Sequence, residues 1–418
     1  MRVMVLSWEY PPVVVGGLGR HVHALSEAMA AAGHEVTVVS RHTAGAAFDE
    51  VVNGVRVVRV PEDPPIFDFR ENLLSWTMAF NHALTRGALA VVDQVAPEVV
   101  HAHDWLVAHA ATTLKHHLGV PLVATVHATE AGRHQGWLPG DLNRSIHTVE
   151  WWLTYEARRV VTCSEYMRWE VTRLFDLPPD KVTPIPNGVL APTVDPDAVA
   201  AVRRRYSGAP LLVFAGRLVY EKGLQDILGA LPRLRRRHPG LKLLVAGEGP
   251  EAENLRAQAR RLRLGRAVDW LGFVDPRQLA TLTAAADCAL VPSIYEPFGM
   301  VALEAAAAGT PLVVAETGGL KEFVRHGTTG LRFRSGDVAG LADAVSLLLR
   351  DEVLARRLAR AGRAALAGYA WPAIAARTVA EYERAVREER ALHDGLRRTQ
   401  GPLRMAVRDG NLLAGDAP

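Results

Sequence analysis

The feature of this chain that most constrains its fold is a regular alternation of short apolar runs with longer amphipathic stretches. The runs are rich in β-branched residues and most are continuously apolar, which is typical of parallel strands covered by helices on both faces. In chain order they read RVMVLS, EVTVVS, VRVVRV, EVVHAH, PLVATV, RVVTCS, LLVFAG, KLLVAG, VDWLGF, CALVPS and PLVVAE. The pattern predicts an α/β protein with doubly wound parallel sheets.

The length of 418 residues is too great for one ordinary domain, so we expect two. The alternation pauses at PIPNGVLAPTVDPDAVAAVRRR, whose Pro, Gly, Asn and Asp content indicates a linker. The predicted parts are a Rossmann-like domain at 1–190, a linker at 191–209, a second Rossmann-like domain at 210–370, a helix at 371–397 that crosses back to the first domain, and a disordered tail at 398–418. Ligands should bind between the carboxyl ends of the two sets of strands.

Composition and charge indicate which kinds of binding partner the protein has and in which cellular compartment it works. A net charge of +3 is small for this length and argues against a dedicated nucleic-acid-binding protein. Cys163 and Cys288 are too few for a disulfide framework, and the first residues have the length of a strand rather than of a secretory segment, so a cytoplasmic location is predicted. No stretch approaches the roughly 20 apolar residues of a transmembrane helix. Peripheral membrane contact remains an alternative to a solvated helix face for four clustered arginines: Arg233, Arg235, Arg236 and Arg237.

Two junctions between a strand and a helix are candidate phosphate sites. In VVVGGLGRHV, Gly16 and Gly17 precede an amphipathic helix whose first N–H groups can bind an anion, although a loop that needs glycine for positive φ is the alternative. The pattern is not the G-x-G-x-x-G dinucleotide fingerprint, which disfavours a dehydrogenase. In GRLVYEKG, Arg217 follows a strand and Lys222 begins the next helix, so both cations can bind a diphosphate. Two solvated cations, with Lys222 paired to Glu221, are the simpler alternative.

Histidines gather where two strands end. HAHDW places His101 and His103 on one face of a strand, with Asp104 directly after them. A binuclear H-x-H-x-D-H pattern would need the aspartate one position later, and zinc-ligand spacings are absent, so polar residues at the mouth of a cleft explain the motif better than a metal site. His127, which follows the next strand, is a candidate substrate contact.

The stretch YEPFGMVALE places Glu296 in a turn and Glu304 within about two turns of the start of the next helix. Carboxylates are favourably placed near the positive end of a helix dipole. Because ionised carboxylates only accept hydrogen bonds, paired sugar hydroxyls are natural partners for them. Capping of the helix by Glu296 is the structural alternative.

Taken together, these motifs resemble the retaining glycosyltransferases of family 4, which have the GT-B architecture. The resemblance covers residues 1 to about 390 and rests on VVVGGLGRHV, HAHDW, HATE, PNGV, GRLVYEKG, GEGP, PSIYEPFGMVALEAAAAGTPLV and TGGL, in family order. Within the family, SWEYPPVVVGGLGRHVH and HAHDWLVAH with HATEAGRH are most similar to the actinobacterial α-1,4-glucosyltransferases of glycogen and methylglucose lipopolysaccharide synthesis.

The resemblance implies catalytic roles for Glu296, His127, Arg217 and Lys222, and a donor-binding role for Glu304. Arg217 and Lys222 match the pair that holds the donor diphosphate and stabilises charge on the leaving nucleotide. Glu304 matches the carboxylate that binds the ribose hydroxyls, and Glu296 the carboxylate beside the transferred sugar. His127 matches the histidine near the sugar ring.

Other matched positions line the donor and acceptor sites. The implied donor-binding loops are Gly16 and Gly17 in the first domain and Thr317, Gly318, Gly319 and Leu320 in the second. Asp104 and Trp105 resemble acceptor-side positions of glycogen synthases. One position departs from the pattern, because larger bacterial glycogen synthases have a lysine directly before the double glycine where this chain has Val15.

The implied reaction is transfer of glucose from UDP-glucose or ADP-glucose to the non-reducing end of an α-1,4-glucan. One alternative keeps the fold and changes the acceptor, to glucose 1-phosphate giving maltose 1-phosphate or to a lipid or mannosyl acceptor. Another is a non-catalytic nucleotide-sugar-binding protein, although Glu296, Arg217 and Lys222 are all present. A front-face retaining route is expected because no second acid is evident. The resemblance implies no cofactor and no metal, so the D-x-D at residues 195–197 is rejected as a metal clamp, and the oligomeric state stays open.

Overall fold

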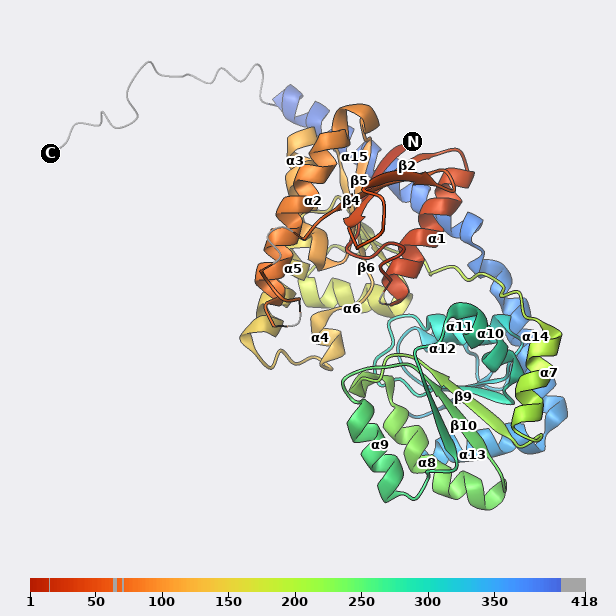
Figure 1. Cartoon of the computed structure of the whole chain (residues 1–418). Helices are drawn as coiled ribbons and strands as arrows, with labels where there is room; N and C mark the ends of the chain where they lie inside the picture. Colours follow the sequence, from red (N-terminus) through yellow and green to blue (C-terminus); the bar gives the residue numbers. More distant parts are fainter. Residues whose placement is uncertain (15, 63–65, 70, 400–418) are drawn as a thin grey trace, which may run out of the picture.

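The computed structural model describes residues 1–14, 16–62, 66–69 and 71–399. It contains two α/β units, each built around its own sheet, and a last helix that runs from the second unit back along the first (Figure 1). Val15 lies outside the described residues. So does the predicted disordered tail, except for residues 398 and 399, which end the last helix.

In the first unit the strand order is β3-β4-β2-β1-β5-β6-β7-β8, and neighbours are parallel except β3 with β4. The strands are β1 (Arg2–Leu6), β2 (Glu35–Arg41), β3 (Asp49–Val52), β4 (Val55–Val60), β5 (Val99–His103), β6 (Leu122–Val126), β7 (Arg159–Thr162) and β8 (Val182–Pro184). Alternate residues of β1 enter opposite cores, as the strand period of two requires. Met4 and Leu6 pack with α2 (Leu73–Val95) and α3 (Ala108–Leu118), and Val3 and Val5 with α1 (Gly17–Ala31).

The second unit has the strand order β11-β10-β9-β12-β13-β14, with parallel neighbours throughout. Its strands are β9 (Leu211–Ala215), β10 (Lys242–Ala246), β11 (Val268–Gly272), β12 (Cys288–Val291), β13 (Leu312–Ala315) and β14 (Leu331–Phe333). Leu212 and Phe214 of β9 face α8 (Leu224–Arg237) and α13 (Val338–Arg350), while Leu211 and Val213 face α10 (Pro276–Ala285) and α11 (Met300–Ala307). Both units therefore confirm the prediction of doubly wound parallel sheets.

The remaining α-helices lie between these elements along the chain. They are α4 (Glu130–Arg133), α5 (Asp141–Glu156), α6 (Glu165–Phe175), α7 (Pro196–Arg205), α9 (Ala252–Arg261), α12 (Leu320–Phe323), α14 (Glu352–Ala365) and α15 (Trp371–Thr399). Across the described parts of the chain, no helix is both long enough and apolar enough to span a membrane.

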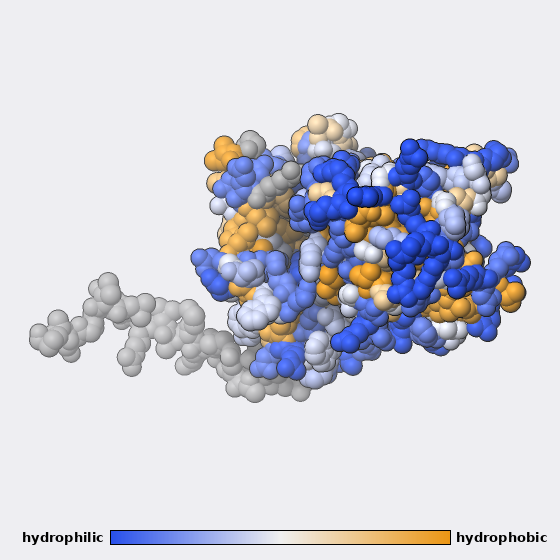
Figure 2. Space-filling view, turned by 90° about the horizontal axis from the view of Figure 1, so that it is seen from below, coloured by the Kyte–Doolittle hydropathy of each residue, from blue (hydrophilic) through white to orange (hydrophobic). Residues whose placement is uncertain are grey.

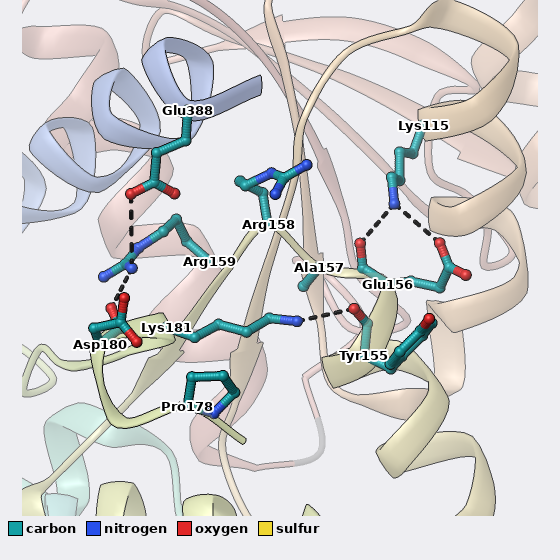
Figure 3. A pocket seen from close by; sticks show the side chains of 10 residues that line it. All are labelled: Lys115, Tyr155, Glu156, Ala157, Arg158, Arg159, Pro178, Asp180, Lys181 and Glu388. Atoms are coloured by element: carbon teal, nitrogen blue, oxygen red, sulfur yellow. Dashed lines mark hydrogen bonds and ion pairs between the residues drawn. The ribbon is translucent and has the colours of Figure 1, made fainter. Parts of the chain in front are cut away.

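The long helix α15 completes the core of the first unit. Its apolar face packs beside α1 over β1. The hydroxyl oxygen of the buried Tyr382 lies 2.7 Å from His101 Nδ1. At the amino-terminal edge of the sheet, Arg159 Nε donates to Glu381 of α15 at 2.9 Å. Glu388 lies over the same arginine beside a cavity of about 480 Å³ (Figure 3). This cavity is at the opposite edge of the sheet from the strand ends that carry the predicted site.

Each predicted apolar run forms a strand, and the structure adds three strands that the pattern did not reveal: β3, β8 and β14. They are short, and β3 is a largely exposed edge strand, so none has a long buried run. The segment predicted as a linker, residues 191–209, contains α7. The side chain of Asp195 is the N-cap of this helix and accepts a hydrogen bond from Asp197 N at 2.9 Å, and Pro196 is the first helical residue. The residues that suggested a loop therefore begin a helix.

Candidate active site

The carboxyl ends of the two sheets meet at contacts between the units. After β7, the Ser164 hydroxyl donates to the Pro297 carbonyl at 2.6 Å. After β6, Thr129 N donates to the Tyr295 hydroxyl at 3.2 Å, and that hydroxyl donates to Glu170 of α6 at 2.9 Å. The turn that carries Glu296 is thereby held against the strand ends of the first unit, as expected for ligand sites in α/β sheets.

Lys222 and Glu296 form the centre of the second unit's contribution. Lys222 ends the short helix η3 (Tyr220–Lys222), and its Nζ lies 2.8 Å from Glu296 Oε2. The Ser293 hydroxyl donates to the same oxygen at 2.9 Å. The pair is largely buried, with side-chain exposures of 25% for Lys222 and 12% for Glu296. A cation and a carboxylate are thus fixed side by side where β12 ends.

Arg217 stands after β9 at the same edge. Its guanidinium lies 3.6 Å from Glu221 Oε1, and its side chain is about half exposed. Burial and the positive charge of Arg133, which belongs to the first unit, lower the pKa of Arg217, while Glu221 and Glu9 oppose that shift. A positive charge from the first unit therefore acts on Arg217, and an anion bound at this guanidinium would relieve the repulsion.

Glu304 of α11 meets a partner that the sequence did not indicate. Arg20 Nη1 of α1 donates to Glu304 Oε1, which joins the two units directly. Burial raises the pKa of Glu304, and the arginine opposes this shift. The carboxylate assigned to ribose is thus held by a guanidinium from the other unit.

The loop at residues 317–320 lies directly over the turn that carries Glu296. Gly319 N donates to the Glu296 carbonyl at 3.0 Å. Gly318 has φ +48°, and a Cβ there would lie 2.1 Å from the Glu296 carbonyl oxygen. Only glycine permits this approach. Thr317 precedes these glycines, and Leu320 begins α12 with a buried side chain.

The glycine loop of the first unit faces the start of α11. Helix α1 begins at Gly17 rather than after the glycines, and Gly16 is its N-cap. Gly16 N donates to Glu9 Oε2 at 3.0 Å. A Cβ on Gly17 would be 3.8 Å from Met300 Cγ, so the loop lies beside the second unit. Gly16 and Gly17 therefore lie where the first unit meets the start of α11, and their role as a loop over the donor stays a prediction.

At the strand ends of the first unit, the side chain of Asp104 is hydrogen-bonded to the backbone of His127. His127 N donates to Asp104 Oδ1 at 2.7 Å, and Asp104 adopts φ +60°. Burial raises the pKa of Asp104 to about 7. Burial also lowers the pKa of His127 to about 3, so its imidazole is neutral at physiological pH. Trp105 begins the helix η1 (Trp105–Val107) directly after Asp104.

In the D-x-D at residues 195–197, the side chain of Asp195 caps α7. A different set of ligands lies elsewhere, where ring nitrogens of His21, His103 and His127 all lie within 4.8 Å of one another. The sequence placed His103 and His127 at strand ends but gave no indication that His21 would join them.

Three of the four clustered arginines of α8 have partners within the second unit. Arg233 and Arg237 contact Asp343 Oδ1 of α13 at 3.1 and 2.6 Å, and Arg235 donates to the Arg263 carbonyl. The face of the molecule in Figure 2 carries large hydrophilic areas, with broader apolar areas towards its left side. These contacts favour the solvated helix face over the membrane-contact alternative.

Two family models match consecutive parts of the chain. The model described as Glycosyltransferase Family 4 matches residues 15–190, and the model described as Glycosyl transferases group 1 matches residues 195–365. A protein named glycogen synthase from Mycobacterium tuberculosis is 48% identical over 405 residues, which cover 93% of this chain and 96% of that protein. A D-inositol 3-phosphate glycosyltransferase from Segniliparus rotundus is 32% identical and covers 92% of this chain and 90% of its own length.

Solved structures agree with these matches. Sucrose-phosphate synthase from Thermosynechococcus elongatus superposes with a TM-score of 0.80 at 26% identity, covering 91% of this chain and 98% of that one. The catalytic domain of starch synthase IV from Arabidopsis thaliana, bound to ADP and acarbose, gives a TM-score of 0.74 at 20% identity, with 92% and 99% covered. The second likeness concerns the fold alone.

Proposed function

The chain belongs to the family 4 glycosyltransferases and is a glucosyltransferase with the GT-B fold, and from this premise we propose its donor, acceptor and stereochemistry. It moves glucose from UDP-glucose or ADP-glucose to the non-reducing end of an α-1,4-glucan, with retention of configuration. The relative named glycogen synthase supports a glucan acceptor. The solved starch synthase with ADP and acarbose is consistent with an adenine nucleotide and a glucan-like ligand in this fold.

The observation that carries the proposal is the contact between Lys222 Nζ and Glu296 Oε2 at 2.8 Å, held against the strand ends of the first unit. Breaking the bond between sugar and diphosphate builds negative charge on the leaving nucleotide and positive character at the anomeric carbon. Lys222 and Arg217 would stabilise the first charge, and Glu296 the second. Preorganised groups of this kind contribute about 2.7–4 kcal/mol each to transition-state stabilisation.

The nucleotide would be held mainly by the second unit. Glu304 accepts hydrogen bonds from the two ribose hydroxyls in place of the bond from Arg20. Gly16, Gly318 and Gly319 lie on loops that meet at the Glu296 turn and α11, and the first amides of α1, next to this point, suit the phosphate oxygens. In this arrangement the reaction needs no metal ion.

The transferred glucose and the acceptor would lie against the first unit. His127 is neutral, so it donates or accepts a hydrogen bond at a sugar hydroxyl without adding charge. Asp104 fixes the backbone of His127 and presents its second carboxyl oxygen towards an acceptor hydroxyl. Trp105 follows it and offers an indole surface for a sugar ring.

Arg133 favours glucose 1-phosphate as a second candidate acceptor. It ends α4 on the acceptor side and is exposed, and its side chain makes no hydrogen bond or ion pair with the described residues. Its charge acts on both Asp104 and Arg217, so it lies near the two sides of the proposed reaction. A phosphate on the acceptor sugar would supply the anion that this guanidinium lacks.

The deciding experiment incubates the enzyme with UDP-glucose and ADP-glucose against malto-oligosaccharides and glucose 1-phosphate. NMR of the products reads the anomeric configuration and linkage. An α-1,4 product from either donor supports the proposal, whereas a β product or transfer of another sugar contradicts it. Arg133→Ala should raise the KM for glucose 1-phosphate and leave that for malto-oligosaccharides unchanged if the second candidate holds.

Two further measurements test the chemistry. Lys222→Ala should lower kcat by about a hundredfold or more, in line with the loss of one preorganised group. A kcat equal to that of the wild type would contradict the proposal that Lys222 binds the donor diphosphate. Activity that persists after exhaustive chelation supports the metal-free reaction, and strict dependence on manganese would count against it.

A further inference from the structure

Three histidines from separate parts of the first unit converge at one point beneath the cleft. His21 lies in α1, His103 ends β5, and His127 follows β6. The ring centroids are 5.4 Å apart for His21 and His103, 4.8 Å for His21 and His127, and 5.3 Å for His103 and His127. The three imidazoles form a triangle whose ring nitrogens lie within 4.8 Å of one another.

The interior of this triangle is polar but short of partners. His21 and His103 are 4% and 0% exposed. Both ring nitrogens of His21, and Nε2 of His103, have no hydrogen-bond partner among the described residues. A buried polar atom without a partner costs about 1–3 kcal/mol, so a polar occupant between the rings would be stabilising.

We propose that His21, His103 and His127 bind a divalent transition-metal ion of the zinc class, and that this ion inhibits the transferase by engaging His127. The inhibitory part rests on the function proposed above, and the metal site does not. Imidazole is a favoured ligand of Zn²⁺, Cu²⁺ and Ni²⁺. Three histidines with a fourth, open position match the zinc sites that exchange a ligand, with Zn–N distances of about 2.0–2.1 Å.

The hydrogen-bond geometry between two of the rings suits a metal. A neutral imidazole offers one ring-nitrogen lone pair to a metal ion. His103 Nδ1 and His127 Nε2 face each other at 3.0 Å and share one hydrogen. A metal ion between them takes the place of that hydrogen, which moves to the outer nitrogen of the same ring. No proton has to leave the site.

One residue next to the three histidines can support a metal ligand from behind, and carboxylates are missing from the described contacts of the rings. Asn187 lies next to His21, and its Oδ1 is also buried and without a partner. When His21 binds a metal through one nitrogen, its other N–H can donate to this oxygen, which is the usual role of a residue behind a metal ligand. No carboxylate forms a hydrogen bond with any of the three rings among the described contacts. We therefore expect reversible binding rather than a permanent structural ion.

The metal would reach the triangle through the cleft, because His127 is the member of the three that is partly exposed. Once bound through Nε2, His127 would be held rigidly beside the positive charge of the ion, which would disfavour the positive character that develops at the anomeric carbon. The ion would also tie α1, which begins at the glycine loop, to the ends of β5 and β6. Inhibition should accordingly be seen mainly as a lower kcat, with donor binding to the second unit little changed.

The first test measures binding without turnover. The whole enzyme, freed of metal, is titrated with Co²⁺, whose visible absorption reports tetrahedral nitrogen ligation, and with Zn²⁺ by calorimetry. The wild type should bind one equivalent of each ion. His21→Leu should weaken binding by more than about a hundredfold, since loss of an outer partner alone costs about 10–100-fold. His116→Ala, which changes an exposed histidine elsewhere, should bind as the wild type does.

The second test measures inhibition. His21→Leu should keep the metal-free activity and lose inhibition by Zn²⁺, because His21 holds the ion but takes no part in transfer. His103→Gln gives a second variant if His21→Leu does not fold. A wild type that takes up no Co²⁺, or variants that take it up equally well, would overturn the site. If no donor supports transfer, the proposed function fails, yet the Co²⁺ spectrum still decides the metal site.

Discussion

Two lysines that line the same cavity should have opposite effects on stability when they are replaced (Figure 3). Lys115 Nζ lies 2.9 Å from the Glu156 carboxylate. Lys181 Nζ instead donates to the Tyr155 carbonyl at 2.8 Å. Burial, followed by the nearby charges of Arg158 and Lys115, lowers the pKa of Lys181 from 10.5 to about 8. We predict that Lys181→Met stabilises the protein at pH 7 and that Lys115→Met destabilises it.

The magnitude follows from the shift in pKa. At 1.36 kcal/mol per unit, the change from 10.5 to about 8 sets a ceiling of about 3 kcal/mol on the penalty for keeping Lys181 charged in the folded state. Lys181 keeps some contact with solvent, and the substitution also removes one hydrogen bond worth about 1 kcal/mol. The expected net gain for Lys181→Met at pH 7 is therefore about 1–2 kcal/mol.

The sign of the pH dependence is fixed by proton binding. Between pH 8 and 10.5 the unfolded chain binds more protons at Lys181 than the folded protein does, so the stability of the wild type rises with pH across this window. The penalty is complete below pH 8 and disappears above 10.5. The advantage of Lys181→Met should therefore be full at pH 7 and much smaller at pH 10.

Thermal unfolding of the wild type and both variants at pH 7 and pH 10 tests this reasoning. A gain of 1–2 kcal/mol corresponds to a rise in Tm of about 2–8 °C for a unit of this size. Lys115→Met should lower Tm at pH 7, because the carboxylate of Glu156 loses its main cationic partner. A lower Tm for Lys181→Met at pH 7 would refute the charge argument, and an equal gain at both pH values would assign the effect to packing.

Three further predictions concern the cleft and the last helix. Glu304→Gln should chiefly raise the KM for the donor, and Glu296→Gln should chiefly lower kcat. If steady-state kinetics show the reverse, Glu296 is the residue that binds the nucleotide and Glu304 the one that acts on the sugar. Arg20→Met should tighten the binding of UDP or ADP, measured by calorimetry, by up to about fivefold. The reason is that ribose no longer competes with the Arg20–Glu304 ion pair, which is worth up to about 1 kcal/mol. Weaker binding would mean that Arg20 contacts the nucleotide itself. Tyr382→Phe should lower the free energy of unfolding by about 1–3 kcal/mol, because His101 Nδ1 stays buried but loses the Tyr382 hydroxyl that lies 2.7 Å away. An unchanged midpoint of chemical denaturation would contradict this.

The fold was readable from the sequence because parallel strands are buried on both faces and stand out as apolar runs. Weaker elements were not readable. The edge strand β3 has the sequence DEVV and is largely exposed, so it has no apolar run to detect. Helix α7 begins with Asp195 and Pro196, which in a single sequence suggest a turn as readily as a helix start.

The candidate site was readable only where motifs are local. Residues placed at strand ends, such as Lys222 and Glu296, could be found from one short stretch each. Arg20 is 284 positions from Glu304, so nothing in the local pattern of either indicates their contact. His21 is also distant in sequence from His103 and His127, and its position depends on how α1 packs against the sheet. Contacts of this kind appear only once the chain is folded.

The packing of α15 has a consequence for how the protein is made. The first unit consists of two pieces of chain, the amino-terminal part and α15, with the whole second unit between them. A growing chain usually folds its domains in the order of their synthesis. Here the ribosome must complete the second unit before it makes Tyr382 and its neighbours, which cover one face of the first sheet. The domain that begins first is therefore finished last.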